Sequence, residues 1–301
     1  MIRKPSFILT DGNGKELQEK KLHSLDLTVN DGDIRQFAAG HIPPHWHKEL
    51  EIFLLLEGNI RIGIGDSTYR LQAGDGCFIN TETLHSFTAE TASPCKYRSF
   101  VFGPEIIGGM PGSIFDTAYV RPLLENGAAY MKFQRGNGDD VYFEQFAHAF
   151  SACESPEYGY EFHVRNALSS ILLYVQSRCT GGTDSRSIPS IHEIRLKEML
   201  LWIDGNLGNS ITVSEIADAA NICTRECQRI FHHYLHYSPV EYVRRKRIFH
   251  AARLLSDTDM PVTDIALNCG FSNPSYFSKQ FRELMENTPS GYRAAARDNS
   301  I

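Results

Sequence analysis

The sequence predicts an α+β protein of more than one domain, with a β-sandwich or β-barrel followed by helical regions. Short strand-like runs separated by turn residues fill about residues 22–103. From about residue 141, apolar residues recur at helical spacing instead. The length of 301 residues also exceeds the usual span of one compact core, which excludes a single small module.

Composition places the chain among ordinary globular proteins. Hydrophobic residues make up 42% and charged residues 22%, and no stretch approaches the roughly 20 unbroken apolar residues of a membrane span. The start of the chain reaches polar Thr10 before a signal-peptide core of about 7–15 apolar residues can form. The seven cysteines are scattered without a Cys-x-x-Cys pair, which indicates reduced thiols. We therefore expect a cytoplasmic protein without export, membrane contact, disulfides or structural zinc.

The first region consists of strand signals and turn signals in alternation. Strand-like runs include residues 51–56, 59–64 and 76–79. Turn signals rich in Gly, Asp and Asn separate these runs. Many short strands at such spacing are typical of a sandwich or a barrel.

The middle region has helical periodicity. Phe143, Phe146 and Phe150 fall on one face of a first helix. A second, amphipathic helix is expected over Tyr160–Arg178, and its apolar stripe can pack against its own barrel or against a second copy in a dimer. The segment 180–189 is rich in Gly and Ser and lacks apolar periodicity, so it is interpreted as an interdomain linker.

The C-terminal region contains an internal repeat. Ile216-Ala217 recurs 49 residues later as Ile265-Ala266. Each copy has a short helix, a tight turn and a second helix that starts near residue 223 or 272, which is the order of a helix-turn-helix. Three further residues recur 50 positions later, as the pairs Phe231 and Phe281, Pro239 and Pro289, and Tyr242 and Tyr292.

The outward residues of the two second helices are the predicted DNA-binding residues. In a helix-turn-helix the second helix enters the major groove, and its N-terminal residues meet base edges. Arginine pairs with guanine and glutamine with adenine through two hydrogen bonds each, and the first copy offers both types. Ser272 is expected to cap the second of these helices. The predicted residues are Arg225, Glu226, Gln228 and Arg229 in the first copy, and Asn273, Pro274, Ser275, Ser278 and Lys279 in the second.

Charge differs between the two parts of the chain. Residues 191–301 carry 13 basic and 13 acidic residues, so the whole net charge of −6 lies in the first 190 residues. The C-terminal part concentrates its cations in the run Arg244-Arg245-Lys246-Arg247. This run suits contact with a polyanion, and Arg244 and Arg245 are predicted to contact DNA. The alternative is an ordinary solvated helix surface.

The second copy carries a long motif. Residues 264–281 read Asp-Ile-Ala-Leu-Asn-Cys-Gly-Phe-Ser-Asn-Pro-Ser-Tyr-Phe-Ser-Lys-Gln-Phe, followed by Thr288-Pro289 and Tyr292-Arg293. Together with the repeat, this motif closely resembles the signature of the AraC/XylS family of bacterial transcription regulators. The resemblance covers about residues 191–297. It implies two helix-turn-helix subdomains joined by a long helix at about Pro239–Leu255, with both recognition helices facing the same side of the DNA.

The chain departs from this family pattern at two helix ends. The family usually closes each recognition helix with Gly, whereas this chain has His236 and Glu286. A residue other than Gly is strained in the left-handed conformation of such an end. We therefore expect these helix ends to be rearranged.

The N-terminal region carries a second motif. Residues 40–58 fit the spacing Gly-x4-His-x-His-x3-Glu-x6-Gly, and His85 follows about one hairpin later. This pattern resembles the two motifs of the cupin superfamily, a small jelly-roll barrel, although the usual Pro and Gly ahead of the second histidine are absent. His45 and His47 share strand parity, so both imidazoles can point into one barrel. Glu51 and His85 complete a set of three histidines and one carboxylate, which suits Zn, Fe, Mn or Ni.

Three interpretations of this polar set stay open. Sensor cupins fused to AraC-type domains resemble this stretch and are understood as effector pockets, so the first is a polar pocket without metal. The second is a divalent transition metal bound by all four polar residues, and the third is a group of buried histidines without any ligand. Three aromatic residues are expected either to stack on a sugar or to serve as packing. The predicted effector-binding residues are His45, Trp46, His47, Glu51, Phe53, Tyr69 and His85.

Together these features predict a cupin-like effector-sensing barrel (residues 1–115), a helical dimerisation region with a linker (116–189), and a domain with two helix-turn-helix motifs (190–301). The predicted function is a ligand-responsive bacterial transcription regulator that binds duplex DNA as a homodimer, with RNA polymerase as a further partner. A sugar or sugar derivative is the expected effector, by analogy with the family's frequent place in carbohydrate use. No catalysis is expected and no cofactor is required. The alternative is a metal-dependent cupin enzyme with a helical appendage, although an enzyme has no need for two recognition helices.

Overall fold

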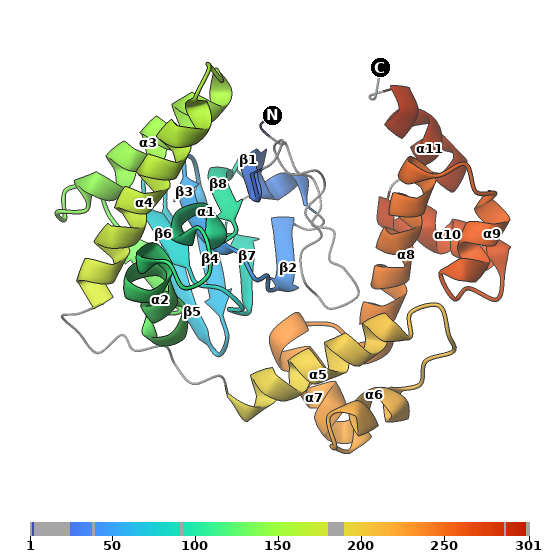
Figure 1. Ribbon diagram of the computed structural model, residues 1–301. Helices are drawn as coiled ribbons and strands as arrows, with labels where there is room; N and C mark the ends of the chain where they lie inside the picture. Colours follow the sequence, from blue (N-terminus) through green and yellow to red (C-terminus); the bar gives the residue numbers. More distant parts are fainter. Residues whose placement is uncertain are drawn as a thin grey trace. The chain divides into compact units, whose positions relative to one another are not determined.

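The structure is a computed structural model, and it describes Ile2 and residues 25–37, 40–90, 93–179, 190–285 and 287–298. These residues separate into two compact units, one reaching Ser190 and the other beginning at Ile191. Figure 1 shows the β-strands of the first unit and the helices of the second. The predicted linker at 180–189 lies outside the described residues.

The first unit is built on two antiparallel sheets with an apolar core between them. One sheet has the strand order β1-β8-β3-β6-β9, and the other has the order β2-β7-β4-β5. A short 3-10 turn at Ile34–Gln36 follows the first strand. The strands are β1 (Leu27–Asp33), β2 (His41–His45), β3 (Leu50–Leu55), β4 (Asn59–Ile64), β5 (Ser67–Gln72), β6 (Gly76–Ile79), β7 (His85–Ala89), β8 (Lys96–Phe102) and β9 (Tyr130–Phe133).

Two apolar cores bury the five-stranded sheet on both faces. The inner core lies between the sheets and includes Phe53, Ile62 and Phe87. The outer core lies on the other face, where the helices α3 (Asp140–Glu154) and α4 (Tyr160–Cys179) run side by side (Figure 1). The strand β3 is therefore buried along its whole length, whereas β4 alternates between buried and more exposed residues because one face of its sheet meets solvent.

The amphipathic helix α4 packs on its own unit. The sequence left two alternatives for its apolar stripe, which were packing against the barrel of the same chain and packing against a second copy. The structure buries the stripe against the barrel of the same chain. Phe162 and Leu173 lie away from this stripe and are 68% and 50% exposed. A dimer contact through α4 would therefore use these residues and not the stripe. The stripe consists of Val164, Ala167, Leu168, Ile171, Leu172 and Val175.

One strand comes from a part of the chain for which the sequence predicts helices. The strand β9 pairs with β6, so the sheet extends beyond residue 115. The structure therefore differs from the expected helical region. The sequence did not reveal this strand because four residues are too few to show the two-residue period of a strand. The chain between β8 and β9 forms α1 (Glu105–Gly108), a π-helical turn (Asp116–Val120) and α2 (Arg121–Asn126).

Every regular element in the described residues of the second unit is a helix. We call α5–α7 its first subdomain and α9–α11 its second, and the long helix α8 connects them. The pairs α6–α7 and α9–α10 are the two helix-turn-helix motifs that the repeat predicts. None of the described helices is long and apolar enough to cross a membrane. The helices are α5 (Ile191–Gly205), α6 (Val213–Ala219), α7 (Thr224–Leu235), α8 (Pro239–Asp257), α9 (Val262–Asn268), α10 (Pro274–Met285) and α11 (Pro289–Asp298).

Candidate DNA interface and histidine cluster

The first recognition helix, α7, has one buried and one exposed face. Cys227 and Ile230 are buried in the core, as the sequence predicts. Arg225 and Gln228 are exposed on the opposite face, within the first two turns of the helix. Cys223 precedes the helix without capping it through a side-chain hydrogen bond. The structure thus leaves the side chains of Arg225 and Gln228 accessible at the end of the helix that meets base edges.

Two of the four predicted residues on α7 bond to each other. The Arg229 guanidinium donates to Glu226 Oε2 at 2.8 Å and to Glu226 Oε1 at 2.6 Å. The Nε2 atom of His192, in the first turn of α5, lies 3.1 Å from Glu226 Oε1. The Arg229 side chain lowers the pKa of Glu226 to about 2, so this carboxylate is charged at neutral pH. Sequence spacing gives no sign of His192, which lies 34 residues from Glu226.

The second recognition helix, α10, is capped by Asn273 and not by Ser272. The Oδ1 atom of Asn273 accepts hydrogen bonds from the backbone N–H groups of Ser275 and Tyr276, at 2.9 and 3.1 Å. Proline suits the first position of a helix, so the helix starts at Pro274 and the residue directly before it becomes the cap. The prediction of Ser272 as the cap is therefore wrong. The side-chain oxygen of Asn273 is occupied by this capping.

The outward face of α10 carries most of the residues predicted for it. Ser275 and Lys279 are exposed, as is Pro274, and Ser278 is half-buried. The opposite stripe is buried in the core, and Phe277 lies within it. The face that the sequence predicts for DNA contact is therefore polar and largely accessible.

The basic run in α8 does not form one cationic surface. Arg244 and Arg245 both pair with Glu241, one turn earlier, and Arg244 also bonds to Gln280 of α10. Lys246 is only 7% exposed. Successive residues of a helix point in different directions, so four adjacent cations cannot all face one polyanion. The interpretation of the whole run as a polyanion-binding surface is wrong for this reason.

The end of α7 keeps the left-handed conformation in which Gly is usual. His236 has φ 57° and ψ 18°. The expected rearrangement of this helix end is therefore wrong, because the chain accepts the strain of a side chain in this conformation. The second position of this kind, Glu286, lies outside the described residues.

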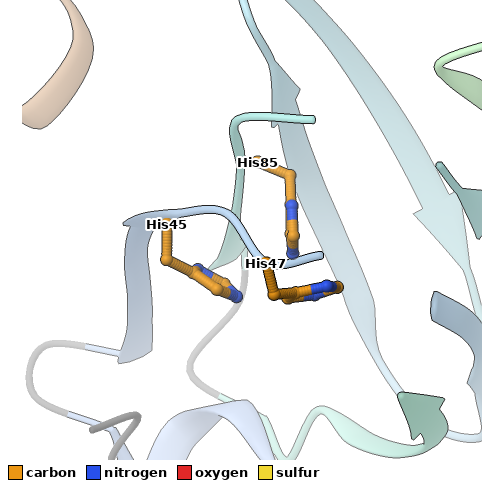
Figure 2. Close-up of side chains that lie close together, drawn as sticks. All are labelled: His45, His47 and His85. Carbon is orange, nitrogen blue, oxygen red and sulfur yellow. The ribbon is translucent and has the colours of Figure 1, made fainter. Parts of the chain in front are cut away.

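Three histidines of the barrel point toward one another (Figure 2). His45 ends β2 and His85 begins β7, and the two are direct partners in the antiparallel register. His47 follows in the turn between β2 and β3. The ring centroids of His45 and His85 are 4.2 Å apart, and those of His47 and His85 are 5.0 Å apart. All three residues are 1% exposed, so the cluster lies inside the protein.

Backbone carbonyl groups fix the orientation of these rings. The Nδ1 atom of each ring lies 2.8–2.9 Å from a carbonyl oxygen two residues away, at Pro43, Glu49 and Thr83. A carbonyl oxygen can only accept, so each Nδ1 atom carries a proton and donates it. In a neutral ring the Nε2 atom then holds a lone pair. The ligating nitrogens of the three rings all lie within 4.8 Å of one another.

Glu51 brings a carboxylate to the same place. Its Oε2 atom lies 3.4 Å from Nε2 of His47 and 3.3 Å from Nε2 of His85. Burial opposes the charge of Glu51, but hydrogen bonds from His47 and His85, which require a proton on Nε2 of each ring, hold its pKa well below the usual range. Burial lowers the pKa of His45, and its two neighbouring imidazoles lower it further, so His45 is neutral at pH 7. The four polar residues singled out from the sequence are thus one buried set.

The three predicted aromatic residues have different surroundings. Trp46, between two of the histidines in sequence, is 8% exposed. Phe53 is completely buried and stacks on two other aromatic rings of the inner core, so it packs in that core. Tyr69 lies on the edge strand β5, is 39% exposed, and stacks on Tyr130 with ring centroids 4.4 Å apart.

Known protein families match both units of the chain. The family model described as an AraC-like ligand binding domain matches residues 33–136. The model described as a helix-turn-helix domain matches residues 216–295, a range that contains both α7 and α10. These two matches correspond to the barrel with the histidine cluster and to the two helix-turn-helix motifs.

The similar proteins are transcription regulators and not enzymes. The HTH-type transcriptional regulator YdeC of Bacillus subtilis (strain 168) is 28% identical over 292 residues, which cover 96% of this chain and 98% of that protein. The HTH-type transcriptional activator AarP of Providencia stuartii is 37% identical over 98 residues, which cover 33% of this chain and 73% of that protein. The solved DNA-binding domain of AdpA in complex with a target DNA is 30% identical and covers 35% of this chain and 95% of that one, with a TM-score of 0.34. The family models and the relatives confirm the resemblance seen in the sequence: the chain belongs to the AraC family of transcriptional regulators, with a ligand-binding domain and a DNA-binding helix-turn-helix domain.

Proposed function

We propose that this regulator binds specific duplex DNA through both α7 and α10, and that a small molecule in the barrel alters that binding. The observation that carries the proposal is the exposure of Arg225 and Gln228 on the first recognition helix, opposite a buried stripe. An effector that favours one arrangement of the chain shifts an existing equilibrium toward it. Because we propose duplex DNA as its target, we also propose that the protein works in the bacterial cytoplasm.

Arg225 and Gln228 are the base-reading residues of α7 in this proposal. They are three positions apart, so they lie on the same face of the helix. Arg225 can donate two hydrogen bonds to the acceptors on the major-groove edge of guanine. Gln228 can donate one hydrogen bond to adenine and accept one from it. Arg229 shares its charge with Glu226, so this pair contributes less to base reading than Arg225 does.

The proposed contacts of the second recognition helix are weaker individually. Ser275, Ser278 and Lys279 offer hydroxyl and ammonium groups, and Pro274 offers an apolar surface at the start of the helix. Asn273 contributes through its amide N–H2 group, because its oxygen caps the helix. Arg244 and Arg245 are proposed as phosphate contacts of α8, reduced in strength by their shared partner Glu241.

A titration of the full chain against DNA tests this proposal. Duplexes are first selected from a random-sequence pool, and binding is then measured at several salt concentrations. Groove binding predicts that log affinity falls linearly with log salt. Arg225→Ala should cost about 1–3 kcal/mol on the selected duplex and relax the preference at particular base pairs. Equal losses on every duplex would contradict the assignment of Arg225 as a base reader.

We propose a sugar or sugar derivative as the effector. The hydroxyl groups of a sugar need hydrogen-bond donors and acceptors, which the histidines and Glu51 supply inside the barrel. Trp46 and Tyr69 supply aromatic faces for the apolar side of such a ring. A thermal-shift screen of the full chain with sugars and with aliphatic acids of similar size tests this choice, since a bound ligand raises the melting temperature. A shift with the acids alone would contradict a sugar effector.

We further propose that the histidine set can hold a divalent transition metal. Three rings whose Nδ1 atoms donate to carbonyl groups leave their Nε2 atoms for a metal, and Glu51 adds one oxygen. These ligands suit Zn, Fe, Mn or Ni. A metal bound there would supply Lewis acidity toward an oxygen atom of the effector. A metal-free polar pocket would use the same residues, and the metal content of the protein distinguishes the two.

We also propose that the regulator acts as a homodimer. Phe162 and Leu173 are both exposed on α4, and their separation of 11 residues is about three helical turns, which places them on one face. Two copies would double the DNA site and raise the affinity through effective concentration. Replacement of both residues by Ser, followed by sedimentation analysis, tests the dimer. RNA polymerase is the proposed further partner of the DNA-bound regulator.

A further inference from the structure

Arg247 of α8 bonds to both helix-turn-helix subdomains at once. Its Nε donates to the carbonyl oxygen of Leu207 at 3.0 Å, and its Nη2 donates to that of Asn209 at 2.6 Å. Both carbonyl groups belong to the loop between α5 and α6 in the first subdomain. Its Nη1 donates to the carbonyl oxygen of Gly270 at 3.0 Å. Gly270 lies in the turn between α9 and α10 of the second subdomain.

The two subdomains also meet closely beside this guanidinium. Gly270 has a φ of +78°, and a Cβ atom there would lie 2.8 Å from the carbonyl oxygen of Leu207 and 2.8 Å from the Arg247 guanidinium. A Cβ atom at Gly208 would lie 3.0 Å from the carbonyl oxygen of Asn268. Backbone therefore packs against backbone at this contact, and both glycines permit the close approach.

Arg247 lies in the part of α8 where the contacts of this helix change from the first subdomain to the second. Lys246, one residue earlier, pairs with Asp204 of α5 in the first subdomain. Ile248 and Leu255 pack in the core of the second subdomain. A long helix can curve, so α8 alone leaves the angle between the two subdomains adjustable. A second connection beside the helix closes a loop between them and removes that freedom.

Arg247 is chemically suited to this contact and poorly placed for phosphate. Burial lowers the pKa of its guanidinium, and its hydrogen-bond partners in the described part of the chain are the three carbonyl oxygens. A planar guanidinium presents several donors in a fixed fork, which allows one side chain to bond to carbonyl groups from two segments. A lysine ammonium lacks this geometry.

We propose that Arg247 is a positioning residue that fixes the separation of α7 and α10, so that the regulator reads the distance between two DNA half-sites as well as their sequences. This inference rests on the proposed function, in which both helices bind DNA. Each base pair inserted between two half-sites moves them apart by about 3.4 Å and rotates them by about 35°. A rigid pair of recognition helices therefore tolerates few changes in spacing, whereas a loosened pair tolerates more.

The test uses the full chain and duplexes selected by it from a random-sequence pool. One or two base pairs are then inserted between the two selected half-sites, and binding is measured by fluorescence anisotropy on the parent, the inserted and a single-half-site duplex. The wild type should lose at least about tenfold in affinity per insertion. Arg247→Ala should bind the parent duplex about tenfold more weakly but lose less than about threefold on insertion. Its affinity for the single half-site should stay within about threefold of the wild type.

Two further variants separate positioning from charge and folding. Arg253→Ala removes one cation from the same helix and should keep the wild-type spacing profile. Arg247→Lys keeps the charge and, like Arg247→Ala, should make the affinity less dependent on half-site spacing. If Arg247→Ala melts below the assay temperature, the comparison is made with Arg247→Lys alone. The proposal is overturned if Arg247→Ala and Arg247→Lys lose affinity by the same factor on every duplex, or if the wild type shows no preferred spacing. A wild-type chain that binds no duplex overturns the proposed function itself.

Discussion

Lys246 and Asp204 form a buried ion pair that joins α8 to α5, with Nζ of Lys246 2.5 Å from Oδ1 of Asp204 and side chains only 7% and 1% exposed. Breaking such a pair leaves one buried charge without its counter-charge, which typically costs about 3–5 kcal/mol. Lys246→Ala should therefore lower the free energy of unfolding by about this amount. Urea unfolding of the full chain, monitored by the circular dichroism of its helices, measures this loss of unfolding free energy.

A matched double variant checks that the pair is responsible. Lys246→Met with Asp204→Leu removes both charges and keeps apolar volume at the site. Replacing a buried pair by apolar residues is often neutral or stabilising, so the double variant should be more stable than Lys246→Ala. A loss below about 1 kcal/mol for Lys246→Ala would show that the contact is solvated and contributes little.

Acid should remove the contribution of the Glu226–Arg229 pair. The pKa of Glu226 falls from 4.5 to about 2 on folding, with Arg229 as the main cause. A carboxyl with a lowered folded pKa stabilises the folded state above its unfolded pKa, and that stability is lost as the pH falls toward the folded pKa. The pair is partly exposed, so we expect Glu226→Gln to cost only about 0.5–1 kcal/mol at pH 7. Denaturation at pH 7, 5 and 3 gives the difference in unfolding free energy between the wild type and Glu226→Gln. This difference should shrink between pH 5 and 3, and a constant difference would contradict the stabilising role of the pair.

Relief of strain at the end of α7 should stabilise the protein. His236 has a left-handed φ of 57°, which costs a residue with a side chain about 1–2 kcal/mol. His236→Gly should raise the free energy of unfolding by about 0.5–1 kcal/mol, since glycine also makes the unfolded chain more flexible. Calorimetry of the helical transition measures the effect. His233→Gly, within the same helix, should destabilise the protein and serves as the control.

Metal analysis should distinguish the two forms of the barrel site. If the histidine set binds a transition metal, untagged protein should contain about one equivalent, and His47→Ala or His85→Ala should reduce it below about a tenth. His163, which is exposed on α4, provides the control, and His163→Ala should leave the content unchanged. Less than about a tenth of an equivalent in the wild type would contradict the metal form and favour the metal-free pocket.

Local patterns in the sequence predicted much of the fold and of the polar sites. The helical period assigned Cys227, Ile230 and Phe277 to the core, and the structure buries all three. The resemblance to the two cupin motifs also predicted that His45, His47, Glu51 and His85 lie together, and the structure places them in one buried set. The helical assignments succeeded because the helical period is a local property of the chain. The histidine set was predictable only because the two cupin motifs together specify a contact between distant strands.

Contacts between distant segments could not be predicted in this way. Lys246 is part of a basic run in the sequence, but its partner Asp204 lies on another helix. His192 reaches Glu226 only after two helices pack. Arg247 bonds to carbonyl groups, which every residue possesses, so no sequence motif identifies its partners.

The late strand β9 decides how the sensing half of this regulator can be isolated. Because Tyr130–Phe133 pairs with β6, a truncation at residue 115 would leave β6 as a bare sheet edge with unsatisfied amide and carbonyl groups. Such edges recruit other chains and cause aggregation. The same truncation would strip α3 and α4 from the outer core. A fragment for crystallisation or ligand screening should therefore extend through Cys179, the last residue of α4.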